Sequence, residues 1–333
     1  MSDTFFTSSP EWTWYIIFYF FVGGIAGGAF FLAARLHFFG RPEDRPIIRL
    51  GYYVACAGVL VSGLLLTADL TRPERFWHML IQSNTGRPMF KAWSPMSVGS
   101  WGVMLFGLFS FLGALGALVE EGRLNWKPLR WPLVRALNGR LPAGLIAAVG
   151  SVFGLFLAGY TGVLLSVTNR PIWADSNLLG VLFLFSGVST GAASLILLSH
   201  WRRAGSPSPS PASVEWLAHF DRGALSLELV ALIAFLVSLG SVAQVFVGWW
   251  GVVLLVGVVG AGIVAPLVLE RRAAAEGGGG GDGGGGGGGG SGEGHRHLLR
   301  AAALVLVGGL LLRVVVLLSS GQIHVVGSGV ALP

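Results

Sequence analysis

Eight long runs of apolar residues constrain this chain more than any other feature of its sequence. Each run is 20 or more residues long, and an α-helix needs about 20 apolar residues to cross the ~30 Å hydrocarbon core of a bilayer. Barrel strands alternate polar and apolar residues over about ten positions, so these continuous runs favour helices. We expect eight transmembrane helices over residues 14–39, 49–68, 97–119, 142–168, 177–199, 224–246, 248–269 and 298–319.

The composition agrees with an integral membrane protein. Charged residues are 11% and hydrophobic residues 53% of the 333 positions, whereas a soluble domain carries about 25% charged residues. The net charge of +6 does not indicate nucleic-acid binding, because most of the 22 basic residues fall in the loops on one side. By the positive-inside rule these loops are cytoplasmic and both termini lie outside. We expect a multi-pass protein of the cell inner membrane, in contact with membrane lipid and not with nucleic acid.

Polar residues gather at the outer ends of the expected helices. Asp69 and Arg72 close the second apolar run, where one interpretation is a solvated helix end with weak ion pairs. The alternative makes Asp69 a proton acceptor whose pKa is controlled by Arg72 or Arg75. Intramembrane polar groups that share one depth usually mark a site.

The third and fourth apolar runs bring further polar groups to the same depth. Ser94 is a natural N-cap followed by a proline at the first helical position. Capping does not require Ser97, which lies just inside the membrane. Tyr160 and Thr161 lie in the outer half of the fourth run; an aromatic belt at the interface explains a tyrosine there, and a pocket in which the phenol bonds a ligand carbonyl is the alternative.

Two charged residues in the second half of the sequence fall within expected transmembrane helices. Glu228 lies near the cytoplasmic start of the sixth run, and Arg313 lies in the outer half of the eighth. Both side chains can snorkel toward the headgroups. Otherwise they belong to a proton path, because a charge at the bilayer centre costs about 2.5–3.5 kcal/mol.

Redox ligands are scarce. The single cysteine, Cys56, cannot hold an iron–sulfur cluster, which needs about four thiolates. The seven histidines lie toward the two membrane faces and offer no facing pair for haem. We therefore expect no haem, no iron–sulfur cluster and no metal in this protein.

Several motifs together resemble the NrfD/PsrC family of cofactor-free membrane anchors of respiratory oxidoreductases. They are Gly-Gly-Ile-Ala-Gly-Gly at 23–28, Asp-Leu-Thr-Arg-Pro-Glu-Arg-Phe at 69–76, Ser-Pro-Met-Ser-Val-Gly-Ser-Trp at 94–101 and Gly-Tyr-Thr-Gly at 159–162. The glycine motif by itself indicates close helix packing. The resemblance implies an all-α fold of two four-helix bundles. Its expected parts are an outer N-terminus (1–13), a first bundle with a quinone site (14–171), a second bundle (172–319) with a disordered polyglycine loop (277–294), and an outer tail (320–333).

The resemblance also implies a substrate, partners and residue roles. Menaquinone or ubiquinone would react in the first bundle, with Tyr160 and Asp69 as catalytic groups. Quinone-binding residues would be Tyr15, Tyr19, Arg72, Ser97 and Thr161, with Glu11 as an alternative ligand near the first helix. A ferredoxin-like iron–sulfur subunit would dock on the outer face and lead to a catalytic subunit, which can be a molybdenum enzyme.

Our interpretation is a quinone-reactive subunit of a multi-subunit oxidoreductase that is not catalytic alone and that can couple to proton translocation. One rival is a transporter or proton channel that uses Glu228 and Arg313. A second rival is a structural anchor in a complex that binds quinone elsewhere.

Overall fold

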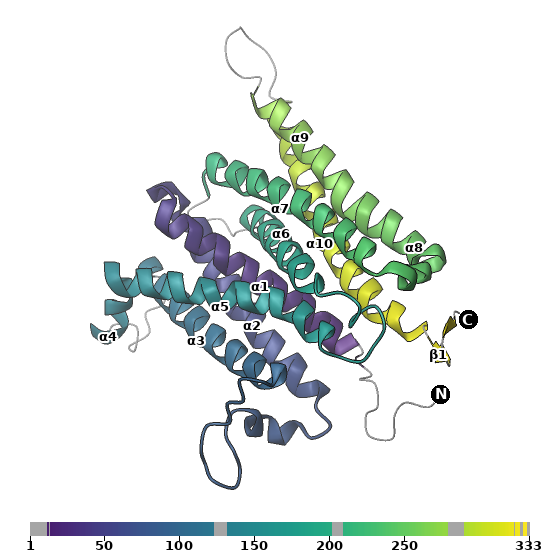
Figure 1. The fold of residues 1–333 in the computed structure, drawn as a ribbon. Helices are drawn as coiled ribbons and strands as arrows, with labels where there is room; N and C mark the ends of the chain where they lie inside the picture. The colour runs from purple at the N-terminus through teal and green to yellow at the C-terminus, as the bar shows by residue number, and fades with distance from the viewer. Residues whose placement is uncertain are drawn as a thin grey trace.

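The protein is a helical membrane protein in the computed structural model, which describes residue 12 and residues 14–122, 132–201, 209–278, 290–322, 324–326 and 329–331. Long helices run roughly side by side through the molecule (Figure 1). They are α1 (Trp14–Phe39), α2 (Arg45–Asp69), α3 (Pro95–Glu121), α5 (Arg140–Ser166), α6 (Leu179–His200), α7 (Pro211–Ser238), α9 (Ala265–Gly278) and α10 (Gly290–Ser319).

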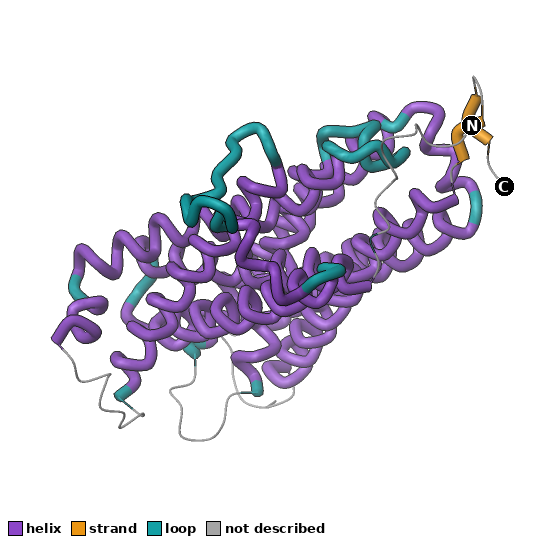
Figure 2. Tube along the Cα trace, turned by 90° about the horizontal axis from the view of Figure 1, so that it is seen from below, coloured by secondary structure: helices purple, strands orange, loops and turns teal. Residues whose placement is uncertain are grey.

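Shorter elements connect or extend these helices (Figure 2). They are η1 (Pro42–Asp44), η2 (Pro73–Met79), α4 (Pro132–Arg135), η4 (Ala136–Asn138), η5 (Gly240–Val247), α8 (Trp249–Val252), η6 (Val253–Val264) and η7 (Ser320–Gln322). The segment η6 is a π-helix between α8 and α9. Strands β1 (His324–Val326) and β2 (Gly329–Ala331) pair antiparallel after α10.

Within the described residues, seven helical segments are long and apolar enough to cross a membrane. The helix α7 qualifies as an eighth only when it is taken together with η5, which is bent away from it. The α8–η6–α9 segment counts as one of the seven. The protein is therefore a multi-pass, all-α membrane protein. Apart from their end residues, seven of the predicted spans coincide with these helices or lie inside them.

The sixth predicted span, 224–246, begins inside α7 but runs past the end of this helix. α7 begins at Pro211 because the Ser210 side chain accepts a hydrogen bond from the Ser213 amide at 3.1 Å. It ends at Ser238, and η5 leaves it at an angle of 110°. Gly240 has a φ of +56° at this bend, a backbone conformation that favours glycine.

The predicted loop 277–294 is also shorter than expected. α9 continues through Gly278 and α10 begins at Gly290. Residues 279–289 lie outside the described part of the sequence.

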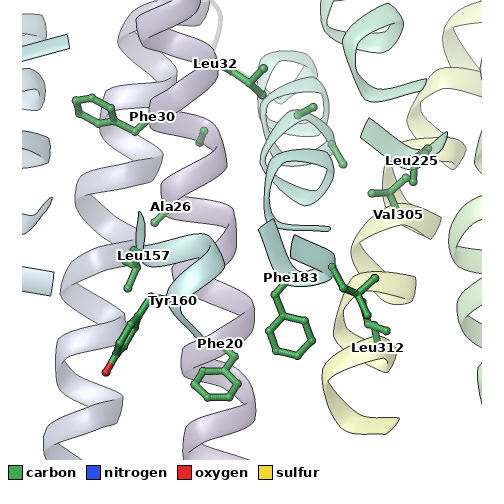
Figure 3. Close-up of a cluster of buried hydrophobic side chains, with 14 of the residues drawn as sticks. Phe20, Ala26, Phe30, Leu32, Leu157, Tyr160, Phe183, Leu225, Val305 and Leu312 are labelled. Atoms are coloured by element: carbon green, nitrogen blue, oxygen red, sulfur yellow. The ribbon is translucent and has the colours of Figure 1, made fainter. Parts of the chain in front are cut away.

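The helix α1 lies at the centre of the packing, against α2, α5 and α6. A Cβ added at Gly27 would collide with the Gly154 carbonyl of α5, and one at Gly28 would collide with the Gly187 carbonyl of α6. The glycine motif thus lets three helices approach closely, as predicted for small residues. Figure 3 shows Phe20 and Phe183 near the contact between α1 and α6.

One buried apolar core continues through all the long helices. In Figure 1, α2, α3 and α5 lie on one side of α1, and α7, α9 and α10 lie on the other. Division into two four-helix bundles remains a prediction, as does the side of the membrane on which each terminus lies. We call the end at which α1, α3 and α6 begin the N-terminal face, and the opposite end the basic face.

Candidate functional site

A cavity of about 280 Å³ lies at the N-terminal face, between α1, α2, α3 and α5. Its polar residues include Tyr19, Asp69, Ser100 and Tyr160, each from a different helix. The remaining wall is largely apolar and is formed by Trp12, Ile16, Leu66, Leu70, Phe76, Met79, Leu80, Met96, Val103, Met104 and Leu164, among others. An apolar pocket with a few converging polar groups is the usual form of a small-molecule site.

Tyr160 is held in place by contacts on three sides. Its ring stacks on Phe156, with centroids 5.2 Å apart and planes at 22°, and its hydroxyl donates a 2.6 Å hydrogen bond to the Pro95 carbonyl. A Cβ at Gly99 would collide with the phenol, so this glycine of α3 makes room for it. Figure 3 shows the hydroxyl on the side of the ring away from Phe20.

The hydrogen bond to Pro95 bears on the chemistry of Tyr160. A phenol has one O–H to donate and can also accept. The proton now points to Pro95, so the predicted donation to a ligand carbonyl requires the O–H to rotate toward the cavity. The oxygen can accept a hydrogen bond from a ligand without that rotation.

Asp69 is the last residue of α2 and is half-buried at the cavity. The predicted pairing with Arg72 or Arg75 is not found: among the described residues, no ion pair of 4.0 Å or less joins them. The backbone is extended at Leu70, which directs the following residues away from the axis of α2. Arg72 is exposed and does not line the cavity. Asp69 therefore faces the cavity without the predicted partner.

On α1, only one of the two predicted tyrosines reaches the cavity. Tyr19 lines it and is 2% exposed. Tyr15 is 50% exposed and lies outside the lining, although Ile16, the next residue, lies within it. Trp12 lines the cavity and stacks on Trp173 at 5.5 Å. Glu11 lies outside the described residues.

Ser97 and Thr161 fix the backbone and do not line the cavity. The Ser97 hydroxyl donates to the Met89 carbonyl at 3.2 Å and accepts from the Lys91 amide at 3.0 Å, so it ties the preceding loop to α3. The Thr161 hydroxyl donates to the Ala158 carbonyl of its own helix at 3.0 Å. Each helical position turns by about 100° from the last, which directs these side chains away from the cavity.

Glu228 and Arg313 are buried and do not snorkel. Arg313 donates to the Ser186 hydroxyl at 2.6 Å and to the Gly309 carbonyl at 2.7 Å. Its guanidinium lies over the Phe183 ring, 5.1 Å from the centroid. Ser186 also neighbours Glu228, and Glu228 and Arg313 interact electrostatically. The two predicted charges thus belong to one buried cluster.

The prediction missed a second pair of buried carboxyls, Asp221 on α7 and Glu270 on α9. They lie side by side, and Asp221 accepts a 2.6 Å hydrogen bond from Ser189. Apart from the contact with Asp221, neither side-chain oxygen of Glu270 has a hydrogen-bond partner among the described residues. Two facing carboxyls can share one proton. A cavity of about 450 Å³ at the basic face reaches Glu270 and is lined also by His200 and His295.

No group of three or more His, Cys, Asp or Glu residues that could hold a metal ion occurs in the part of the sequence that the structure describes.

Comparison with known proteins relates this protein to a group of reductase subunits. Residues 4–275 match the family model described as "Polysulphide reductase, NrfD". The sequence is similar to protein NrfD of Escherichia coli, at 28% identity over 81% of this chain and 87% of the relative. It is also similar to a polysulfide reductase subunit of Wolinella succinogenes, at 27% identity over 78% of this chain and 82% of the relative. A selenate reductase subunit of Mesobacillus selenatarsenatis is 23% identical over 58% of this chain and 48% of the relative.

Proposed function

Because this chain belongs to the NrfD family of polysulphide reductase membrane subunits, we propose that it is the quinone-reactive subunit of a respiratory reductase in the cell inner membrane. Relatives named as subunits of polysulfide and selenate reductases support a role within a multi-subunit complex. The observation that carries the quinone assignment is the cavity that Tyr19, Asp69 and Tyr160 line together.

The cavity fits the head group of a quinone. Its volume of about 280 Å³ lies near the lower end of the ~300–1,000 Å³ range of ligand pockets. A flat ring would contact the largely apolar wall, and the isoprenoid tail would extend into lipid. Menaquinone and ubiquinone both meet these requirements.

Asp69 and Tyr160 are placed to handle the protons. Reduction of a quinone to a quinol takes up two electrons and two protons, and the reverse reaction releases them. Asp69 lines the cavity with a carboxyl that can accept or give a proton, and Tyr160 can bond one ring oxygen once its O–H rotates from Pro95. Neither side chain transfers electrons, so the electrons come from or go to a partner.

The N-terminal face offers a surface for that partner beside the cavity. Phe76, Trp77, Phe90 and Trp93 of the connection between α2 and α3 are exposed, Trp93 by 81%. Aromatic residues are enriched in protein interfaces. We propose that a ferredoxin-like iron–sulfur subunit docks here and passes electrons to or from a catalytic subunit, which can be a molybdenum enzyme.

A proton path can connect the basic face with the membrane interior. It would run from the cavity at Glu270 to Asp221 and Ser189, and then along α6 to Ser186 beside Glu228 and Arg313. Buried ionisable residues that face other helices are typical of proton relays. This path favours proton coupling as a secondary function of the same subunit.

Fluorescence quenching by a water-soluble quinone analogue tests the site in the purified protein. Trp12 lines the cavity, so a bound analogue would quench it, and Trp12→Phe should remove much of the saturable signal. Tyr160→Phe should raise the Kd of the analogue about two- to tenfold, as expected from the loss of one hydrogen bond of about 0.5–1.5 kcal/mol.

The matched control is Tyr53→Phe, which removes a hydroxyl from α2 outside the cavity lining. Equal affinity of the analogue for wild type and Tyr160→Phe would contradict the site. Substrate flux through the isolated protein, without quinone binding, would favour the transporter.

A further inference from the structure

A third cavity, larger than the two already described, lies at the basic face, at the opposite end of the helices that form the quinone cavity. Its volume is about 830 Å³, and it is enclosed by the end of α1, the start of α2, the end of α3, η4 and the start of α5. Nothing in the proposed quinone chemistry uses it. The charge and polarity of its walls indicate the class of ligand that it would recognise.

The mouth of this cavity has an excess of positive charge. Arg45, Arg49 and Arg140 line it, together with His37, whereas Glu120 is its one acidic lining residue. Arg45 pairs with Glu120 at 3.2 Å in an exposed contact, which screening by water makes weak. Among the described residues, Arg140 belongs to no ion pair. An anion at the mouth would therefore meet a site whose charge is incompletely neutralised.

Arg49 adds a charge that is hard to satisfy without a further anion. Its side chain is largely buried, and its nearest ion-pair contact, to Glu121, is long at 3.9 Å. Its Nε donates a 3.4 Å hydrogen bond to the Arg45 carbonyl. A buried cation is expensive unless it is closely paired, so a phosphate near Arg49 would lower this cost.

The walls beyond the mouth are apolar, and this feature decides between phosphate ligands. Leu112 and Ile48 line the cavity, while Leu141 and Leu145 at the start of α5 are exposed by 79% and 63%. Free phosphate gains nothing from such a surface, whereas an acyl chain buries apolar area against it. Basic pockets between membrane helices at the cytoplasmic side are typical binding sites for anionic lipid headgroups.

We propose that this cavity binds an anionic phospholipid of the cytoplasmic leaflet, with its phosphate at Arg45, Arg49 and Arg140 and an acyl chain along Leu141 and Leu145. The proposal does not rest on the quinone site, which lies at the other face. It assigns the basic face to the cytoplasm, as the distribution of basic residues predicts.

Native mass spectrometry of the purified protein in a neutral detergent tests this proposal. The protein is titrated with dioctanoyl phosphatidylglycerol, with dioctanoyl phosphatidylcholine and with glycerol 1-phosphate. The expected result is saturable binding of phosphatidylglycerol, with markedly weaker binding of the other two. Arg140→Gln should weaken phosphatidylglycerol binding about fivefold, the fold-change that corresponds to roughly 1 kcal/mol per basic residue at an anionic surface.

Two variants distinguish lipid binding at this site from binding that depends only on the positive charge of the surface. Arg87→Gln removes an exposed arginine at the N-terminal face and should leave binding unchanged. Arg49→Gln can disturb folding because the residue is buried. The variant that tests the proposal is therefore Arg140→Gln, at an exposed residue. Three results would overturn the proposal: unchanged binding in Arg140→Gln, equal binding of phosphatidylcholine, or equal binding of glycerol 1-phosphate.

Discussion

Substitution of Gly99 by alanine tests how α3 positions Tyr160. A Cβ at this position would overlap the hydroxyl and the ring of Tyr160. The phenol would have to move, and its 2.6 Å hydrogen bond to Pro95 would be lost or lengthened. The change adds one methyl group and no charge, but Gly99 itself lines the cavity. Comparison with the same change in a Tyr160→Ala background therefore separates displacement of the phenol from a direct contact between the methyl group and a ligand.

The expected magnitudes follow from these contacts. Overpacking a well-filled contact costs about 1–3 kcal/mol, and the lost hydrogen bond costs about 0.5–1.5 kcal/mol. The higher helix propensity of alanine returns about 0.5–1 kcal/mol. The free energy of unfolding should therefore fall by about 0.5–4 kcal/mol. The Kd of a quinone analogue should rise about two- to tenfold if Tyr160 loses one hydrogen bond to the ligand.

Thermal unfolding and analogue titration of the purified variant measure the two effects. Gly107→Ala on the same helix is the matched control, since its Cβ would meet only Val59 at an ordinary 3.9 Å. In a Tyr160→Ala background, Gly99→Ala should cost no more than Gly107→Ala, because the colliding ring is gone. Wild-type quinone affinity in the single Gly99→Ala variant would refute the reasoning.

Three further predictions concern the charged residues. Asp69→Asn should lower quinone turnover in the assembled complex by about 10²–10⁴-fold while the Kd of an analogue changes little. The control variant Glu43→Gln, at an exposed residue of η1 at the basic face, should turn over normally. Arg313→Gln should lower the free energy of unfolding by about 3–5 kcal/mol, because it leaves Glu228 without its cation; adding Glu228→Gln should recover part of the loss in thermal unfolding. Glu270→Gln should reduce proton uptake during quinone turnover in proteoliposomes without changing analogue affinity, and unchanged uptake would exclude this residue from the path.

Most of the fold could be predicted from the sequence, because a membrane span depends mainly on length and apolar content. The exception is α7, where Asp221, Arg222 and Glu228 lower the local hydropathy. Its true start is marked by the capping signal at Ser210 and Pro211, which lies outside the apolar run. Its bent end was hidden because the sequence remains apolar beyond Gly240.

The candidate site could be predicted only in part. Tyr19, Asp69 and Tyr160 reach the cavity, whereas Tyr15, Ser97, Thr161 and Arg72 do not. In helices that are apolar on all sides, the sequence shows the depth of a residue better than the direction in which it points. Gly99, which makes room for Tyr160, lay within a recognised motif but had no evident role without the contact.

The carboxyl pair of Asp221 and Glu270 could not be predicted for a different reason. These residues come from α7 and α9, and no local spacing relates them. Sequence position places both in basic loops or helix ends, where an ionised, solvated side chain is expected. Only the packing of α7 against α9 buries the two carboxyls together.

Photoaffinity labelling with an azidoquinone tests the central claim most directly. The purified protein is labelled and digested, and the modified peptides are identified by mass spectrometry with and without excess unlabelled quinone. We predict competed labels within residues 63–80, 96–104 and 160–164, which line the cavity at the N-terminal face. Competed labelling confined to α6–α10, or no competed labelling at these three segments, would contradict the assignment.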